Sequence, residues 1–321
     1  MGKILITGFS GFVSRYFLEY LEHNGIDTLI KGIDVQGPDF NQESYKKIKF
    51  DFEKVDLLDK DKVESIIFEF KPDYILHLAS FSSVAFSWKD PLLSFQNNTN
   101  IFLNLLEAIR KSEISTRILS VGSSEEYGNV EEKDLPLTES HSLKPVSPYA
   151  VARVSQELLS KIYNNGFGLD IVMTRSFNHI GPFQKDVFVL PSFVKQLVKM
   201  KKLGVKCKDI ITGDETIVRD FTDVRDVVAA YYLLLTRGEK GEVYNVCSGR
   251  GWSLKEIIEI ISRILEIEMP TIKKDPKLLR PDDNKIIVGS NEKITNNLNW
   301  QARYSIEESL EDVIKYWEGQ I

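Results

Sequence analysis

Four side chains in two segments of the chain are suited to acid–base chemistry on an alcohol. Ser123 and Glu125 follow the apolar run Arg117–Val121, while Tyr149 and Arg153 lie four residues apart at the start of a helical stretch. That spacing puts the tyrosine and the cation on one helix face, although the same spacing also occurs in plain surface packing. A nearby cation favours the deprotonated form of a tyrosine, which can take the proton of an alcohol while hydride leaves the carbon.

A glycine turn near the N-terminus is typical of a dinucleotide site. Gly8 permits a tight turn, Gly11 lets the main chain approach a pyrophosphate, and the start of the following helix favours negative charge. An ordinary strand-to-helix loop is the alternative, and Ser14 stands where a third glycine is usual. The residues predicted to contact the dinucleotide here are Gly8, Ser10, Gly11, Phe12 and Val13.

An acidic residue at the end of the second predicted strand indicates which dinucleotide binds. Asp34 is placed where a carboxylate bonds to the adenosine ribose hydroxyls and repels a 2′-phosphate, so NAD is favoured over NADP. A carboxylate that only caps a turn is the alternative. The other residues predicted to line the cofactor site are Asp56, Leu57, Leu78, Ala79, Ser80, Asn98 and Val121, together with Tyr149 and Arg153.

The elements that position these residues alternate between short apolar runs and helical periodicity. Predicted strands lie at Lys3–Thr7, Thr28–Ile33, Lys49–Phe50, Tyr74–Leu78, Arg117–Val121 and Ile171–Arg175. Predicted helices lie near Gly11–Asn24, Lys60–Phe70, Pro91–Lys111 and Ser147–Asn164. Strands alternating with helices predict an α/β fold with a doubly wound parallel sheet of the Rossmann type.

After Phe177 the pattern changes to short helices, Pro-punctuated loops and brief strands. The helix Thr222–Leu235 and the strand Glu242–Val246 interrupt this pattern, so the chain is expected to return to the first sheet there. We therefore predict a Rossmann domain made of residues 1–176 and 222–247. The predicted second unit is a smaller, discontinuous α/β substrate lobe of residues 177–221 and 248–321.

The composition excludes several classes of function. The 321 residues have a formal net charge of −6, which argues against a general nucleic-acid binder. The two cysteines, Cys207 and Cys247, cannot build a disulfide framework, and the four histidines have no metal-ligand spacing. The first apolar run breaks at Gly8, and no run is long enough to span a bilayer. We therefore expect a cytoplasmic protein without a metal, a membrane span or a nucleic-acid partner.

Together these features resemble the extended short-chain dehydrogenase/reductase family, over nearly the whole chain. The resemblance implies an NAD-dependent enzyme that acts on a nucleotide-linked sugar. Five segments are most similar to family members that act on GDP-sugars, namely Ser123–Gly128, Ser147–Ala152, Asn178–Pro182, Arg219–Val224 and Leu279–Pro281.

The resemblance also implies roles for single residues. Ser123 would hydrogen-bond the sugar 4-hydroxyl, Tyr149 would be the base, and Glu125 would take the C5 proton in an elimination. Asn98 would support the loops around the cofactor. The residues expected to bind the substrate are Ser83, Ser123, Asn178, Arg219 and Arg280. For each arginine, a surface ion pair is the alternative.

Family members with different activities share these residues. Asp34 and Glu125 are the residues that distinguish between those activities. A 4,6-dehydratase recycles its own bound NAD, whereas stand-alone reductases mostly use NADPH, so Asp34 favours the dehydratase. It would oxidise C4, eliminate water across C5–C6 and return hydride to C6 of a GDP-hexose such as GDP-mannose or GDP-N-acetylglucosamine. A GDP-4-keto-6-deoxy-hexose reductase and a 4-epimerase are the alternatives. Similar reductases also have Ser-Ser-Glu in the loop that here contains Glu125, so this residue does not exclude a reductase.

Two departures from the family pattern open a further alternative. Arg153 stands where the family has lysine, and the planar guanidinium is not equivalent to an ammonium group. Arg153 and Ser14 together leave open the alternative that the protein binds NAD or a nucleotide-sugar without catalysing a reaction.

The helices Leu92–Arg110 and Pro148–Tyr163 have apolar residues on more than one face. One face would cover the sheet, and the other would pair in a homodimer or a dimer of dimers, with two buried faces as the alternative. The apolar residues concerned are Phe95, Ile101, Leu105, Val151, Leu158 and Ile162.

Overall fold

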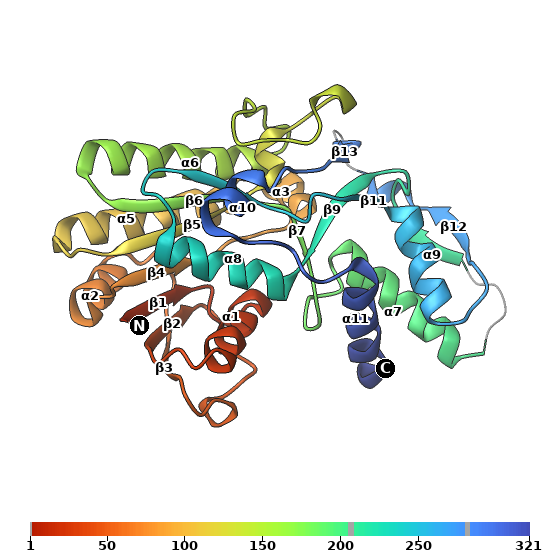
Figure 1. Ribbon diagram of the computed structural model, residues 1–321, viewed down its shortest axis with the longest axis horizontal. Helices are drawn as coiled ribbons and strands as arrows, with labels where there is room; N and C mark the ends of the chain where they lie inside the picture. Colours follow the sequence, from red (N-terminus) through yellow and green to blue (C-terminus); the bar gives the residue numbers. More distant parts are fainter. Residues whose placement is uncertain (1, 205–208, 280–282) are drawn as a thin grey trace.

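A seven-stranded parallel sheet forms the centre of the larger part of the computed structural model, which describes residues 2–204, 209–279 and 283–321 (Figure 1). The strands lie in the order β10-β6-β5-β4-β1-β2-β3, and each neighbouring pair is parallel. This arrangement confirms the predicted doubly wound α/β fold. The strands are β1 (Lys3–Thr7), β2 (Leu29–Asp34), β3 (Lys49–Lys54), β4 (Tyr74–His77), β5 (Arg117–Ser123), β6 (Asp170–Ser176) and β10 (Val243–Val246).

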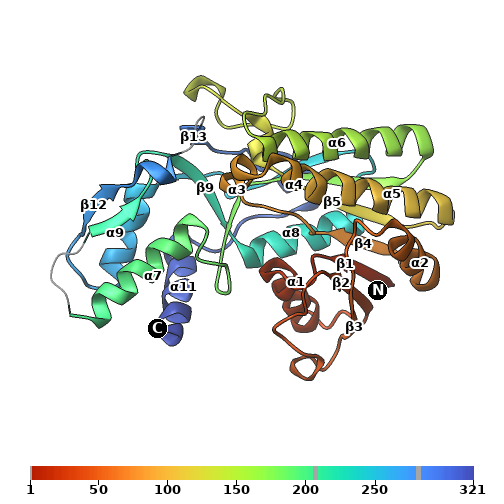
Figure 2. The same cartoon turned by 180° about the vertical axis from the view of Figure 1, so that it is seen from behind.

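Helices cover both faces of this sheet because the strands are apolar on both sides. Side chains alternate along a strand, so Ile4 and Ile6 of β1 point to one face and Leu5 to the other. The first face is covered by α1 (Phe12–His23) and α8 (Val224–Arg237), and the second by α2 (Lys60–Phe70), α5 (Ile101–Ser112) and α6 (Pro148–Phe167). Figures 1 and 2 show these two layers from opposite sides.

The segment predicted as one helix, Pro91–Lys111, is interrupted in the structure. It consists of α4 (Pro91–Phe95), a single π-helical turn (Gln96–Asn100) and α5. The amide of Asn98 donates to the carbonyl of Ser94 at 2.7 Å, and that of Asn97 donates to the carbonyl of Leu93 at 3.0 Å. Side-chain amides that bond to the main chain in this way compete with regular helical bonds, and π turns often occur at functional sites.

The second lobe has its own core, in which three helices pack on small sheets. The helices are α7 (Val189–Lys202), α9 (Leu254–Ile264) and α11 (Ile306–Gln320). The strand β9 (Val218–Asp223) pairs with β7 (Asn178–Ile180), β11 (Gly251–Ser253) and β13 (Ile286–Ile287), while β8 (Asp209–Thr212) pairs with β12 (Thr271–Lys274). The remaining α-helices of the described chain are α3 (Val84–Lys89) and α10 (Glu292–Leu298).

The chain returns from this lobe to the first sheet at β10, which pairs with β6. The helix that precedes it begins two residues later than predicted, because β9 continues through Asp223 and α8 starts at Val224. Asp223 caps this helix by accepting a hydrogen bond from the N–H of Arg225. No helix within the described ranges is long and apolar enough to cross a membrane.

Candidate active site

A cleft of about 1150 Å³ lies between the carboxyl ends of the sheet strands and the second lobe. The sheet order reverses beside β1, which has β2 on one side and β4 on the other. Open α/β sheets bind ligands at such a switch point. The cleft is lined both by the turn after β1 and by β9 of the second lobe, so the two parts of the chain share one site.

The turn after β1 has the geometry of a phosphate-binding cradle. Gly8 has a φ of +69°, and a Cβ on it would lie 2.7 Å from the main-chain nitrogen of Ala79, so only glycine fits. Helix α1 begins directly after this turn, and neither a side-chain cap nor an acidic residue occupies its first turn. Its first N–H groups therefore face the cleft without a side-chain partner, which is the arrangement that binds an anion.

The carboxylate of Asp34 lies at the outer edge of this cradle. It accepts hydrogen bonds from the main-chain N–H of Ser10 at 3.0 Å and of Gln36 at 3.4 Å. Both residues line the cleft together with Asp34. The carboxylate is thus fixed beside the phosphate cradle, in the position where a ribose hydroxyl can donate to it.

Most other residues predicted for the cofactor also line the cleft. Asn98 is the exception, because it is fully buried and does not reach the cleft. Its amide donates to the carbonyls of Ser94 and Phe81, the latter at 3.3 Å, so it supports the loop that forms one wall. The predicted residues that do line the cleft are Gly8, Ser10, Gly11, Phe12, Val13, Asp56, Leu57, Leu78, Ala79, Ser80 and Val121.

Tyr149 and Arg153 contact each other in the wall of the cleft. The Nε of Arg153 donates to the Tyr149 hydroxyl at 3.1 Å. Its Nη1 donates to the carbonyl of Val121 at 3.0 Å and to Oε1 of Gln156 at 2.6 Å. The guanidinium is therefore held in one orientation by three acceptors, and its positive charge lies against the phenol oxygen.

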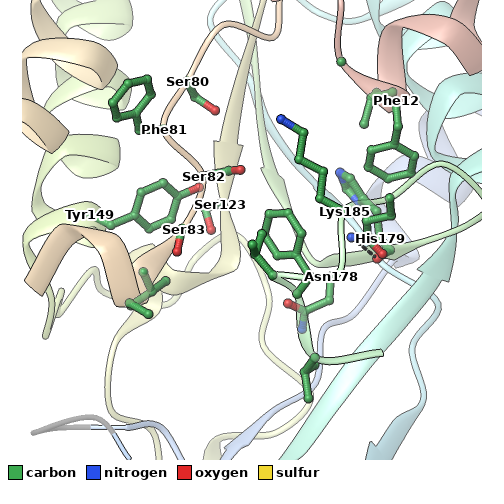
Figure 3. Close-up of a pocket in the computed structure, with 18 of the residues that line it drawn as sticks. Phe12, Ser80, Phe81, Ser82, Ser83, Ser123, Tyr149, Asn178, His179 and Lys185 are labelled. Carbon is green, nitrogen blue, oxygen red and sulfur yellow. Dashed lines mark hydrogen bonds between the residues drawn. The ribbon is translucent and has the colours of Figure 1, made fainter. Parts of the chain in front are cut away.

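Ser123 presents its hydroxyl to the same part of the cleft. Its Oγ accepts a hydrogen bond from the N–H of Glu125 at 3.2 Å, which leaves the hydroxyl hydrogen available to donate into the cleft. In Figure 3 the hydroxyl groups of Ser123, Ser83 and Tyr149 gather on one wall. Glu125 is half-buried and lines the cleft two residues beyond Ser123.

A carboxyl group that sequence reasoning missed lies behind Ser123. Glu126 is fully buried, and its Oε1 accepts a hydrogen bond from the N–H of Ser123 at 2.7 Å. Burial raises the pKa of Glu126 well above its ordinary value, and the charge of nearby Glu157 raises that pKa further. The signal in the sequence is the pair of adjacent glutamates, Glu125 and Glu126, of which the prediction names only the first.

The predicted substrate residues are divided between two walls. Ser83 and Asn178 line the cleft, and the Oγ of Ser83 also caps α3 by accepting from the N–H of Phe86. Arg219 lines the cleft too, and its Nη2 pairs with the carboxylate of Asp283 at 3.0 Å. The ion pair raised as the alternative is thus present, on a side chain that also reaches the cleft. Arg280 lies outside the described residues.

Two further residues face the cleft from the segment after β6. Figure 3 shows Lys185 reaching into the cleft opposite the serine and tyrosine hydroxyls, with His179 behind it. The Nε2 of His179 lies 3.2 Å from the Tyr231 hydroxyl, and burial lowers the pKa of His179 to about 4, so the ring is neutral. Within the described ranges, no cluster of three or more histidine, cysteine or acidic residues could hold a metal ion.

Comparisons with known proteins agree on the fold and on the class of site. The chain is 32% identical over 319 residues to the GDP-6-deoxy-D-mannose reductase of Pseudomonas aeruginosa, covering 99% of this chain and 98% of the relative. It is 28% identical over 338 residues to the dTDP-glucose 4,6-dehydratase of Haemophilus influenzae, covering 99% and 98%.

Two solved structures are similar over almost their whole length. The structure of RMD from Pseudomonas aeruginosa complexed with NADPH has a TM-score of 0.85 and 31% identity, and it covers 100% of both chains. The Thermus thermophilus UDP-glucose 4-epimerase complex with NAD has a TM-score of 0.85 and 28% identity, covering 99% of this chain and 100% of that chain. The family model described as GDP-mannose 4,6 dehydratase matches residues 5–313, and the chain therefore belongs to this family of nucleotide-sugar enzymes with the extended short-chain dehydrogenase/reductase fold.

Proposed function

We propose that the protein is an NAD(H)-dependent oxidoreductase that reduces the C4 ketone of a nucleotide-linked 4-keto-6-deoxy-hexose. The observation that carries this proposal is the contact between Arg153 and Tyr149 beside Ser123, since it provides a proton donor and a hydrogen-bond donor at one point of the cleft. The choice of a reductase is supported by the full-length relationship to a GDP-6-deoxy-D-mannose reductase. The same relationship supports a GDP-linked substrate.

Each of these side chains has a separate role in the proposed reaction. Ser123 donates a hydrogen bond to the C4 oxygen, which polarises the carbonyl, and Tyr149 gives its proton to that oxygen as the carbon is reduced. NADH, when bound, supplies the hydride that C4 accepts. Arg153 holds the phenol in place and stabilises the phenolate that is left after proton transfer.

The choice of NAD(H) rests on Asp34 and on the cradle after β1. The neighbouring reductase structure is complexed with NADPH, and the neighbouring epimerase structure with NAD. In this chain, the carboxylate held by Ser10 and Gln36 would face a 2′-phosphate with like charge. We therefore propose that this protein uses NADH although its relative was studied with NADPH.

A 4,6-dehydratase is the second candidate, and Glu125 is the residue that favours it. Elimination of water needs a base at C5, and Glu125 lies in the cleft wall beside the proposed C4 site. The dehydratase favoured from the sequence thus stays a prediction, with a 4-epimerase as the third possibility within the same family.

We also propose that the two parts of the chain divide the ligands between them. Residues 1–176 and 222–247 would bind the dinucleotide through the cradle and Asp34. Residues 177–221 and 248–321 would bind the nucleotide-sugar, with Asn178, Arg219 and Lys185 on its polar groups.

One pair of reactions tests the proposal. A GDP-4-keto-6-deoxy-hexose incubated with NADH should gain two hydrogens, with loss of NADH absorbance. GDP-mannose or GDP-N-acetylglucosamine incubated without added cofactor should return unchanged. Loss of one water from either GDP-hexose would replace the reductase with the dehydratase, and an isomer of unchanged mass would indicate the epimerase.

A further inference from the structure

The main chain of Ser123 is held by a carboxyl group that does not face the cleft. Glu126 occupies the third position of the short helical turn Ser124–Tyr127, and its side chain turns back to accept the N–H of Ser123 at 2.7 Å. The preceding residue must be glycine, because a Cβ on Gly122 would lie 2.4 Å from the main-chain carbonyl oxygen of Thr174, and it would also lie 2.5 Å from the same carboxyl oxygen of Glu126. The Glu126 side chain is therefore packed directly against the chain that carries the Ser123 hydroxyl.

The cations near this carboxyl group are engaged elsewhere. Arg175 of β6 forms two hydrogen bonds with Glu157 of α6, at 2.9 and 3.0 Å, and Glu157 also pairs with Lys161 at 2.6 Å. Arg153 of α6 donates instead to the Tyr149 hydroxyl, the Val121 carbonyl and the Gln156 amide oxygen. Oε2 of Glu126 is buried and has no hydrogen-bond partner among the described residues.

A buried carboxylate without a paired cation is costly, and binding a proton removes that cost. Glu157 adds to the cost because its own negative charge lies near Glu126, while the hydrogen bond from the Ser123 N–H and the charges of Arg175 and Arg153 oppose it more weakly. The neutral acid keeps one oxygen as the acceptor for the Ser123 N–H. It also places no negative charge behind the C4 oxygen, which gains negative charge as the ketone is reduced.

We propose that Glu126 is a positioning residue of the hydride-transfer site, whose uncharged carboxyl group fixes the main chain of Ser123 so that its hydroxyl points at the sugar oxygen. The proposal rests on the proposed reduction at C4 and adds a residue to that site. Glutamine has the same shape as the neutral acid and keeps the acceptor oxygen, whereas leucine fills the space without an acceptor.

Two variants and a control test this role by steady-state kinetics with a GDP-4-keto-6-deoxy-hexose and NADH. Glu126→Gln should keep kcat near the wild-type value at neutral pH and remove the fall in kcat that ionisation of Glu126 causes in the wild type at alkaline pH. Glu126→Leu should lower kcat about 10- to 100-fold, the range expected when one buried N–H loses its acceptor, with little change in KM. The exposed Glu132→Gln should match the wild type throughout.

A second measurement depends neither on enzymatic activity nor on a variant that lacks the acceptor oxygen of residue 126. Infrared spectra of the wild type at neutral pH should contain the carbonyl band of a protonated carboxylic acid, and Glu126→Gln should lack it. A failed reductase assay with this band present would refute the reduction at C4 and leave the neutral Glu126 intact. The role of Glu126 would be overturned if this band were absent. It would also be overturned if Glu126→Gln lost as much activity as Glu126→Leu, or if Glu126→Leu lost none.

Discussion

Arg153 makes several hydrogen bonds at the same time, with a geometry that a lysine does not have. Its guanidinium bonds to the Tyr149 hydroxyl, the Val121 carbonyl and the Gln156 amide oxygen, and Gln156 in turn donates to Ser120. An ammonium group on a flexible stem cannot reproduce this planar arrangement. The arginine thus preserves the charge that the family pattern requires and fixes it more rigidly.

Replacing this arginine by lysine therefore tests the geometry rather than the charge. Arg153→Lys should lower kcat about tenfold, since at least one of its charge-assisted hydrogen bonds is lost, while NADH binding changes little. Titration of NADH by fluorescence and steady-state kinetics would measure both. A variant faster than the wild type would show that the arginine is a defect in an otherwise lysine-dependent site.

Tyr149 decides whether the protein is a catalyst at all. Tyr149→Phe removes only the hydroxyl, so the fold and the dinucleotide cradle should persist while kcat falls about 10²- to 10⁴-fold. Activity assays beside a binding isotherm for NADH separate the two effects. Equal turnover by the variant and the wild type would show that Tyr149 is not the proton donor, whereas binding of NADH without turnover in both would support the alternative in which the protein only binds NAD or a nucleotide-sugar.

Asp34 should set the preference between the two dinucleotides. Asp34→Ser removes the negative charge beside the adenosine ribose and leaves a hydroxyl that can still bond to it. The ratio of kcat/KM for NADPH to that for NADH should rise at least about tenfold, which corresponds to about 1.4 kcal/mol. A ratio that stays constant would mean that Asp34 only caps the turn through Ser10 and Gln36.

At the scale of elements, a buried histidine joins two strands below the site. The Nδ1 of His77 on β4 lies 2.9 Å from the hydroxyl of Thr7 on β1. Burial lowers the pKa of His77 to about 3, with a smaller contribution from the charge of Arg153. The folded protein therefore keeps this ring neutral at pH values where the unfolded chain protonates it.

The sign of the resulting pH dependence follows from this difference in proton uptake. Below the ordinary value of 6.5, the unfolded chain binds a proton that the folded chain excludes, so stability falls as the pH falls toward the folded value. His77 alone should cost about 2 kcal/mol at pH 5 relative to pH 7. Thermal unfolding at both pH values should show a smaller difference for His77→Asn than for the wild type, and an equal difference would refute this assignment.

The interrupted helix Pro91–Lys111 shows what the spacing of apolar residues cannot predict. The apolar spacing of Pro91–Lys111 is helical throughout, and it predicted the two ends of the segment within one residue. The π turn inside depends on whether Asn97 and Asn98 bond to the main chain, which spacing does not encode. The turn places Asn98 under the loop at Phe81 that forms a wall of the cleft.

At the scale of the whole molecule, one apolar helix face is left exposed by the residues that the structure describes. Val151, Leu158 and Ile162 of α6 are 44, 50 and 57% exposed, and Leu92 of α4 is 70% exposed. Ile101 and Leu105, from the same predicted set of apolar residues, are buried against the sheet and belong to the face that covers it. An apolar stripe of this kind on two adjacent helices supports the predicted pairing with a second copy across a two-fold axis.

A charge placed in this stripe tests the pairing. Ile162→Asp should convert a dimer or dimer of dimers to a monomer in sedimentation experiments, because burying the carboxylate at the interface is unfavourable. Phe68→Asp, on the exposed side of α2, is the matched control and should leave the assembly unchanged. A wild-type chain that sediments as a monomer would refute the prediction without any variant.

The local features of this protein can be predicted from its amino-acid sequence. Gly8, Asp34, Ser123 and Tyr149 could be predicted as site residues because each belongs to a short motif next to a recognisable strand or helix, and parallel strands bring their carboxyl ends to one edge. Tertiary structure alone decided the contacts between residues that lie far apart in the chain. Arg219 pairs with Asp283, and Arg175 pairs with Glu157, so that no cation among the described residues bonds to Glu126. Such pairings depend on how separate elements pack and not on spacing along one element.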